Sequence, residues 1–169
     1  MCLPGREHFQ ALIHLLQYLC DKTNLDLTFY CNIEDATIYK LIKQAGKKNV
    51  KTLFGIHDSL WQDCPDTKQS TGSYVHFSQG GAVDYSTYVP SPVAMLSAEA
   101  ECNSGAVAGM AMPHICMLQN EMNGEEADNL CNCPVIMYCD NASAVTIVNS
   151  NKDILSLRPS KRQLLYMRQ

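Results

Sequence analysis

The sequence has no apolar run that approaches the roughly 20 residues needed by a membrane-spanning helix. Its amino terminus also lacks the charged start, apolar block and small-residue cleavage site of a secretory signal peptide. We therefore expect a soluble intracellular protein, cytoplasmic or nuclear, with no membrane partner. With 169 residues, 46% of them hydrophobic, the chain can bury one sizeable core but is short for two full domains.

The sequence also lacks an excess of positive charge, since its formal net charge is −4. Nucleic-acid binding usually shows as a basic face, so any such face here must be local. One basic cluster comprises Lys40, Lys43, Lys47, Lys48 and Lys51, and another comprises Arg158, Lys161, Arg162 and Arg168. The lysine cluster is the candidate contact for a nucleic-acid backbone. Ordinary solvated surface charge is the alternative for both clusters.

Several motifs of cofactor sites and common enzymes are absent. No glycine-rich loop leads from a strand into a helix as a phosphate cradle, and Ser97 lacks the glycine-flanked turn of a hydrolase nucleophile. We therefore expect no small-molecule cofactor. The nine cysteines are odd in number and scattered, which favours free thiols over a disulfide framework. Cys131 and Cys133 with Cys139 could bind zinc, but no second cysteine pair has zinc-ligand spacing.

The amino-terminal segments show two hydrophobic patterns. Apolar residues recur at three- and four-residue steps over residues 7–20, which predicts an amphipathic helix. After a turn at 21–24, alternation over residues 25–29 predicts a half-buried strand. We interpret residues 31–52 as a linker that contains a short helix around 38–42.

Three strands are predicted next, over residues 53–57, 73–77 and 82–88. Gly80 and Gly81 mark a tight turn between the second strand and the third, so an antiparallel arrangement is expected.

A long helix is then predicted from Ser97, as its amino-terminal cap, to about Asn123. Glu99 in the first turn is favourable near the positive end of the helix dipole. Pro113 removes a backbone hydrogen bond and should kink the helix. The predicted buried stripe comprises Val107, Met110, Ile115, Leu118 and Met122.

The carboxy-terminal part contains one continuous apolar stretch, residues 135–139, which predicts a fully buried strand. A short helix over 142–148 and the beginning of another from 161 come after it. Three antiparallel strands, a long helix, a parallel fourth strand and a short helix together predict an α/β fold with a mixed sheet.

Three carboxylates fall at the ends of these elements: Asp58 after the first strand, Glu101 early in the long helix and Asp140 after the fourth strand. If the first and fourth strands are neighbours, the three residues form a triangle that repels itself unless a cation is present. Hard oxygen ligands suit magnesium, and two such ions can assist phosphodiester hydrolysis. The alternative is three unrelated surface acids, since carboxylates are mostly exposed.

Residues 55–149 resemble the RNase H domain of copia-type retrotransposon Pol proteins. The resemblance lies in ordered blocks, which read WQDCPDTKQSTGSYV from Trp61, GGAVDYST from Gly80, VAMLSAEAE from Val93 and YCDNASAV from Tyr138. The amino-terminal block HLLQYLCDKTNLDLTFY is similar to the helix and strand that end the reverse transcriptase in that polyprotein.

The resemblance implies an RNase H-like fold, with residues 1–30 as the reverse transcriptase tail, 31–52 as the linker and 53–169 as the RNase H-like domain. It implies hydrolysis of the RNA strand of RNA–DNA hybrids during reverse transcription, with the rest of the Pol polyprotein as a further partner. Asp58, Glu101 and Asp140 take the places of the family's catalytic, metal-binding acids. The expected cofactor is two Mg²⁺ ions, with Mn²⁺ as an alternative.

The sequence departs from the family pattern in several places. Leu60 stands where the family usually has a second aspartate, and Cys102 replaces an aromatic residue. The chain ends at Gln169, so we expect it to be truncated before the fifth strand, where the family supplies its fourth acidic ligand. The alternative to a working nuclease is a catalytically inactive remnant that at most binds nucleic acid or another protein.

Overall fold

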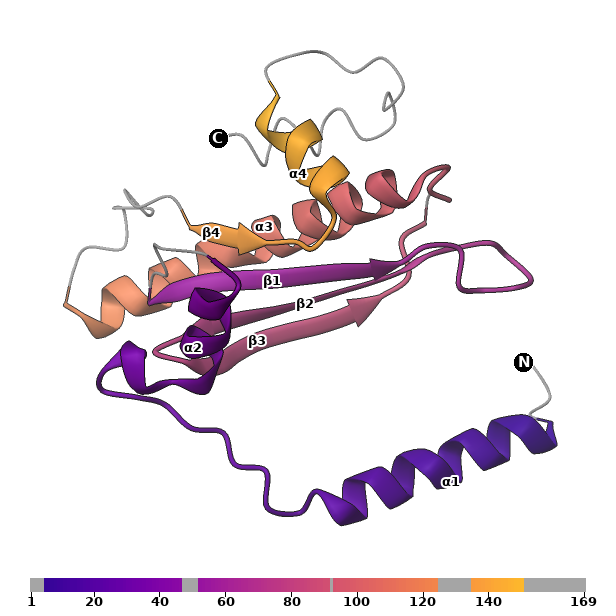
Figure 1. The fold of residues 1–169 in the computed structure, drawn as a ribbon, viewed down its shortest axis with the longest axis horizontal. Helices are drawn as coiled ribbons and strands as arrows, with labels where there is room; N and C mark the ends of the chain where they lie inside the picture. The colour runs from indigo at the N-terminus through magenta and orange to yellow at the C-terminus, as the bar shows by residue number, and fades with distance from the viewer. Residues whose placement is uncertain (1–4, 47–51, 92, 125–134, 151–169) are drawn as a thin grey trace.

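The computed structural model describes residues 5–46, 52–91, 93–124 and 135–150 (Figure 1). A four-stranded sheet is built from β1 (Leu53–Leu60), β2 (Thr71–Ser78), β3 (Gly81–Tyr88) and β4 (Ile136–Tyr138), in the order β3-β2-β1-β4. The first three strands pair antiparallel, and β4 pairs parallel to β1. The long helix α3 (Ser97–Met122) connects β3 to β4, and the short helix α4 (Ala142–Asn149) comes after β4. This arrangement confirms the predicted mixed α/β sheet and is consistent with an RNase H-like fold.

The turn between β2 and β3 lies one residue earlier than predicted. Gln79 and Gly80 have φ values of 50° and 77°, whereas Gly81 is already the first residue of β3. Two central residues with positive φ match the twist of the flanking strands, which is why glycine is favoured there. A side chain at position 80 would also collide with Ala36.

Helix α3 packs on the sheet through residues other than those of the predicted stripe. Met110, Leu118 and Met122 are exposed, and Val107 and Ile115 are only half-buried, so the predicted stripe is wrong. The buried helix residues in this region are mostly small or polar: Glu101, Cys102, Asn103, Ser104, Gly105, Ala106, Ala108, Met112 and Cys116. Short side chains let the helix backbone lie close to the strands, which a stripe of long apolar residues would prevent.

The carboxy-terminal end of α3 extends past the described sheet (Figure 1). Met112 and Cys116 form a cluster with Leu53, the first residue of β1. Residues of α3 after Cys116 therefore have no described strand beneath them, which explains the exposure of Leu118 and Met122. The helix continues through Pro113.

The beginning of α3 is held differently from the predicted serine cap. The capping residue is Leu96, and Ser97 is the first helical residue. Glu99 contacts the residues before the helix instead, because its Oε2 accepts a hydrogen bond of 2.8 Å from the Met95 backbone N–H. The indole Nε1 of Trp61 donates to the Ala94 carbonyl at 3.0 Å, which ties this loop to the turn after β1.

The amino-terminal region is only partly as predicted. Helices α1 (Arg6–Asp21) and α2 (Thr37–Gln44) confirm the two expected helices, with a single 3₁₀ turn, η1 (Ile33–Asp35), before α2. The strand predicted for 25–29 is wrong, because no strand forms there and Leu25, Leu27 and Phe29 are exposed. A strand needs a partner along its length, and among the described residues the backbone hydrogen bond next to this segment joins Tyr30 N–H to Gln79 O in the β2–β3 turn. No residue of α1 is buried, and the helix lies apart from the sheet (Figure 1).

Strand β4 is shorter and less buried than predicted. It has three residues, all half-buried, where a fully buried strand was expected. Within the described residues β4 pairs only with β1, so it lies at the edge of the described sheet. The helix predicted from 161 and the basic cluster from Arg158 to Arg168 lie outside the described residues.

Five cysteines in the described ranges have free thiols: Cys20, Cys31, Cys64, Cys102 and Cys139. Cys116 is disulfide-bonded, which differs from the expectation of free thiols. Cys131 and Cys133, considered above for zinc, fall in the part of the chain that is not described. None of the described helices has the length and apolar character required to cross a membrane.

One buried hydroxyl fixes the ends of two strands against α3. Ser104 Oγ lies 2.9 Å from the Asp58 carbonyl and 3.1 Å from the Ser73 carbonyl, and these two residues are partners in the β1–β2 register. The side chain is fully buried, so its hydroxyl offers these carbonyls a donor away from water. Ser104 therefore links the helix to the point where β1 presents Asp58.

We expect Ser104→Ala to lower the free energy of unfolding by about 1–2 kcal/mol, because a buried carbonyl loses its donor. Urea denaturation followed by circular dichroism measures this loss. Ser97→Ala is the matched control, since Ser97 is exposed and does not cap the helix, and its effect should stay below about 0.5 kcal/mol. Equal effects of the two substitutions would contradict the described role of Ser104.

A second buried polar group lies in β2. His76 is fully buried, and its Nδ1 lies 3.1 Å from Asp84 Oδ2 on β3. Burial lowers the pKa of His76 below its ordinary value of 6.5, and this effect outweighs the opposing hydrogen bond and charge of Asp84. The folded protein therefore binds a proton at His76 less readily than the unfolded chain does.

Because the pKa is lowered in the folded state, this contribution to stability is fully present above pH 6.5 and declines as the pH falls below it. We expect the urea midpoint to be lower at pH 5.5 than at pH 7.5, and His76→Gln to reduce that difference. Glutamine keeps a donor for Asp84 but does not titrate. His14→Gln, on the exposed face of α1, should leave the difference unchanged. An undiminished pH dependence in His76→Gln would count against this assignment.

Candidate metal centre

The parallel pairing of β1 and β4 determines which residues meet at one end of the sheet. Phe54, Gly55 and Ile56 pair with Ile136, Met137 and Tyr138. Continued by two residues, this register places His57 beside Cys139 and Asp58 beside Asp140. Asn141 then begins α4, because its Oδ1 accepts a hydrogen bond of 3.0 Å from Ala144 N–H. The position of Asp140 is thus fixed between the end of a strand and the cap of a helix.

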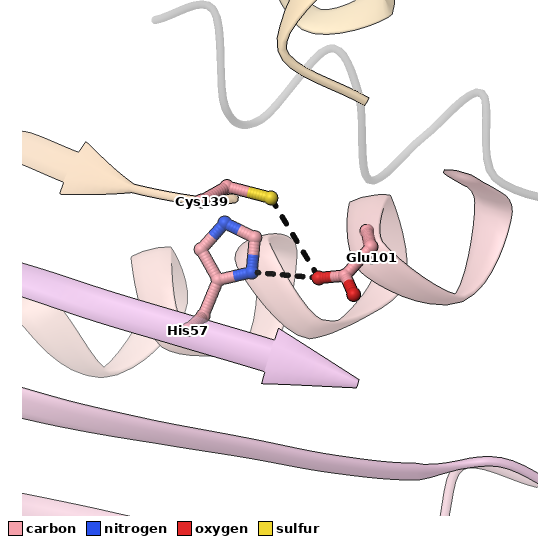
Figure 2. A group of neighbouring side chains, drawn as sticks. All are labelled: His57, Glu101 and Cys139. Atoms are coloured by element: carbon pink, nitrogen blue, oxygen red, sulfur yellow. Dashed lines mark hydrogen bonds and ion pairs between the residues drawn. The ribbon is translucent and has the colours of Figure 1, made fainter. Parts of the chain in front are cut away.

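Glu101 faces this end of the sheet from α3 and is buried. Figure 2 shows that the His57 imidazole and the Cys139 thiol both point toward its carboxylate. Glu101 Oε2 lies 3.7 Å from His57 Nδ1 and 3.7 Å from Cys139 Sγ. The Cys139 sulfur also accepts a hydrogen bond of 3.4 Å from Asn141 N–H.

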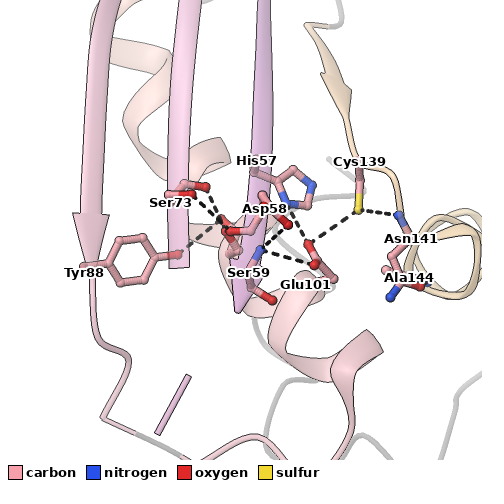
Figure 3. A network of polar contacts seen from close by, with 10 residues as sticks. His57, Asp58, Ser59, Ser73, Tyr88, Glu101, Cys139, Asn141 and Ala144 are labelled. Atoms are coloured by element: carbon pink, nitrogen blue, oxygen red, sulfur yellow. Dashed lines mark hydrogen bonds and ion pairs between the residues drawn. The ribbon is translucent and has the colours of Figure 1, made fainter. Parts of the chain in front are cut away.

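The other oxygen of Glu101 is held by the backbone of β1. Ser59 N–H donates to Glu101 Oε1 at 3.2 Å and to Asp58 Oδ1 at 2.8 Å, so one donor is shared by two carboxylates (Figure 3). Because Ser104 also anchors the Asp58 carbonyl, both the backbone and the side chain of Asp58 are oriented.

Asp58, Glu101 and Asp140 each place one carboxylate oxygen within 4.8 Å of the others. Glu101 is buried, whereas Asp58 and Asp140 are exposed and therefore accessible from solvent. The structure thus brings together the three carboxylates named from the sequence. Their role as metal ligands stays a prediction.

The three carboxylates are electrostatically costly to one another. The pKa of Glu101 is raised, first because burial removes water from its charge and then because Asp58 and Asp140 are negative. Its bonds with Ser59 act in the opposite direction. Among the described residues no lysine or arginine forms a salt bridge with these acids. Three oxygen donors without a cationic side chain fit a hard divalent cation such as Mg²⁺.

The sequence did not indicate that His57 and Cys139 lie together, because Cys139 was considered for zinc only with Cys131 and Cys133. Burial lowers the pKa of His57, against the charges of Asp58 and Asp140, so the imidazole is neutral at pH 7. Burial also raises the pKa of the Cys139 thiol to about 11, and the charges of Glu101 and Asp140 act in the same direction. Each residue directly precedes one of the acids named from the sequence, and this position is the feature that could have indicated it as a further ligand. Spacing rules for metal ligands do not detect this pair, because His57 lies on β1 and Cys139 follows β4, far apart in the sequence.

The two described lysines of the cluster predicted to contact nucleic acid, Lys40 and Lys43, do not lie at the carboxylates. Lys40 and Lys43 are exposed on α2, and Lys43 Nζ lies 5.5 Å from the centre of the Tyr39 ring. Helix α2 lies toward the end of the sheet where β1 begins, whereas the carboxylates lie where β1 ends (Figure 1). Lys47, Lys48 and Lys51 fall outside the described residues.

Comparison with known proteins gives one informative similarity. No family model matches the chain, and no solved structure matches it. Over 144 residues, which make up 85% of the chain, the sequence is 30% identical to the retrovirus-related Pol polyprotein from transposon RE1 of Arabidopsis thaliana. The chain spans 8% of that protein's length. Most of the chain is therefore similar to one segment of a retrotransposon Pol polyprotein, which supports the resemblance found in the sequence blocks.

Proposed function

We propose that this chain is the RNase H-like part of a retrotransposon Pol polyprotein and hydrolyses the RNA strand of RNA–DNA hybrids. The observation that carries the proposal is the convergence of Asp58, Glu101 and Asp140, whose oxygens lie within 4.8 Å of one another. The RNase H-like order of strands and helices and the similarity to a Pol polyprotein support it. In this proposal residues 53–169 carry the activity, and residues 1–30 are the tail of the reverse transcriptase.

The three carboxylates would hold the cations, with Mg²⁺ as the expected ion and Mn²⁺ as the alternative. Two such ions, when bound, activate a water molecule and stabilise the leaving oxygen of a phosphodiester. The contribution of the protein itself is to position the three carboxylates. Asp58 and Asp140 are exposed, so a nucleic-acid phosphate can approach them from solvent. Glu101 is fixed by Ser59 N–H, which limits the movement of the ligand set.

The fold already orders the three carboxylates before any cation binds. Asp58 and Asp140 come from neighbouring strand ends, and Glu101 comes from a helix packed on β1 and β2. Ligands held on packed elements need little further ordering when a cation binds. Any contact of Lys40 and Lys43 with the hybrid would be made away from the carboxylates, along the backbone of a longer duplex.

The first test is cleavage of a labelled RNA–DNA hybrid by the purified chain in Mg²⁺. We expect metal-dependent cleavage of the RNA strand, and a loss of about a hundredfold or more in Asp58→Asn and Asp140→Asn, because each loses a charged ligand. Asp26→Asn is the matched control, because it changes an exposed acid that lies outside the sheet and should therefore leave cleavage normal.

The outcomes of this test separate the proposal from its alternative. A chain that melts cooperatively but cleaves no hybrid would contradict the proposal and favour an inactive remnant. Cleavage that survives in both Asp58→Asn and Asp140→Asn would show that the activity comes from elsewhere.

A second test uses stability instead of activity. Without divalent cations Asp140→Asn should melt a few degrees above the wild type, because a repelling charge beside Glu101 is removed. In saturating Mg²⁺ the order should reverse, because only the wild type binds the ion tightly in the folded state. Differential scanning calorimetry measures the melting temperatures of both proteins, first with a chelator and then with Mg²⁺. The same order of melting temperatures in both conditions would exclude a cation site at these carboxylates.

A further inference from the structure

A second group of potential metal ligands lies against the carboxylates and contains different donor atoms. One ring nitrogen of His57, the Cys139 sulfur and a Glu101 oxygen all lie within 4.8 Å of one another, on β1, after β4 and on α3 (Figure 2). His57 and Glu101 are buried and Cys139 is half-buried. Asp58 and Asp140, the neighbouring residues in the chain, are the exposed members of the first group. Glu101 belongs to both groups.

The buried nitrogen of His57 points to a ligand. Its side chain is 4% exposed, and Nδ1 is inaccessible to solvent and has no hydrogen-bond partner in the described part of the chain. The 3.7 Å separation from Glu101 Oε2 exceeds the distance of a hydrogen bond between nitrogen and oxygen. A buried polar atom without a hydrogen-bond partner lowers the stability of the folded state. A ligand bound to His57 Nδ1 would remove this cost.

The Cys139 thiol donates a hydrogen bond to Glu101 Oε2, and the separations from this oxygen also fit the ligands of one shared ion. Zinc bonds to nitrogen, oxygen and sulfur of about 2.0–2.3 Å place tetrahedral ligands about 3.3–3.8 Å apart. Both separations from Glu101 Oε2, 3.7 Å to His57 Nδ1 and 3.7 Å to Cys139 Sγ, lie in that range. Imidazole and thiolate donors favour zinc, whereas magnesium takes oxygen ligands.

We propose that His57, Glu101 and Cys139 form a zinc site that excludes magnesium from the neighbouring carboxylates. Three protein ligands leave one coordination position for a water molecule. Binding converts the Cys139 thiol to a thiolate, so one proton passes to solvent for each zinc ion bound. Histidine then gains the partner for Nδ1 that it lacks among the described groups of the protein.

The shared glutamate makes the two ions compete. Zinc bound at Glu101 occupies the carboxylate that the Mg²⁺ set needs, because Glu101 belongs to both groups. Zinc should therefore inhibit hybrid cleavage, and this part of the inference rests on the proposed function. Zinc binding itself does not.

The binding test uses Co²⁺ as a spectroscopic substitute for zinc. The wild type should show the near-ultraviolet charge-transfer absorption of a cobalt–thiolate bond, and stoichiometric zinc should abolish it. Cys139→Ser should lose the absorption, and His57→Gln should weaken zinc affinity at least about tenfold, as measured by chelator competition. Cys31→Ser, which changes an exposed free thiol, is the matched control and should bind as the wild type does.

Two outcomes would overturn the zinc site. One is unchanged cobalt absorption in Cys139→Ser, and the other is unchanged zinc affinity in His57→Gln. Circular dichroism of each variant establishes that it is folded. If Cys139→Ser does not fold, the retained fold of Cys139→Ala or of His57→Gln allows the same comparison.

Failure of the zinc site and failure of the proposed function give different results. Asp58→Asn should still bind zinc, because Asp58 is not a ligand of this site, yet it should not cleave hybrid. Zinc binding without any cleavage in Mg²⁺ would contradict the proposed function and leave the zinc site intact. Cleavage in Mg²⁺ that zinc does not inhibit would overturn the competition between the two ions.

Discussion

The parallel pairing of β1 with β4 is the interaction on which the candidate site depends. Only three residue pairs form this ladder, yet its register determines which side chains meet at the strand ends. Continued by two residues, it places Asp58 beside Asp140 and His57 beside Cys139, while α3 packs on β1 and β2 and brings Glu101 to the end of β1. The ladder is the only connection of β4 to the described sheet, so its loss would separate Asp140 from the other two carboxylates.

The cost of this arrangement is repulsion around a buried carboxylate. Burial and two neighbouring acids raise the pKa of Glu101, and backbone hydrogen bonding from Ser59 offsets only part of that. Structures that gather charge in this way give up stability for a cation-binding function. The hydrogen bonds of Ser104 to two strand carbonyls hold the same region together from the helix side.

The helices and strands could be predicted from local sequence patterns, whereas the faces that they bury could not. Local patterns identified α1, α2, α3 and all four strands of the sheet, with β4 recognised by a continuous apolar stretch instead of a repeat. The buried face of α3 was misjudged because its packing uses Ser104, Gly105 and Ala108, which carry little hydrophobic signal. The strand expected at 25–29 had the correct alternation but lacks a partner strand. Asp58, Glu101 and Asp140 could be named because acids at element ends are visible in sequence, whereas His57 and Cys139 depend on register.

The central claim is that Asp58, Glu101 and Asp140 together hold a divalent cation, with Glu101 as the buried member. Electron paramagnetic resonance of Mn²⁺ tests this directly, because the free ion gives a strong signal that binding diminishes. Titration of the folded chain should show bound Mn²⁺, and Glu101→Gln, which keeps the shape and removes the charge, should weaken the affinity at least about tenfold. Mn²⁺ bound equally well by Glu101→Gln would contradict the account.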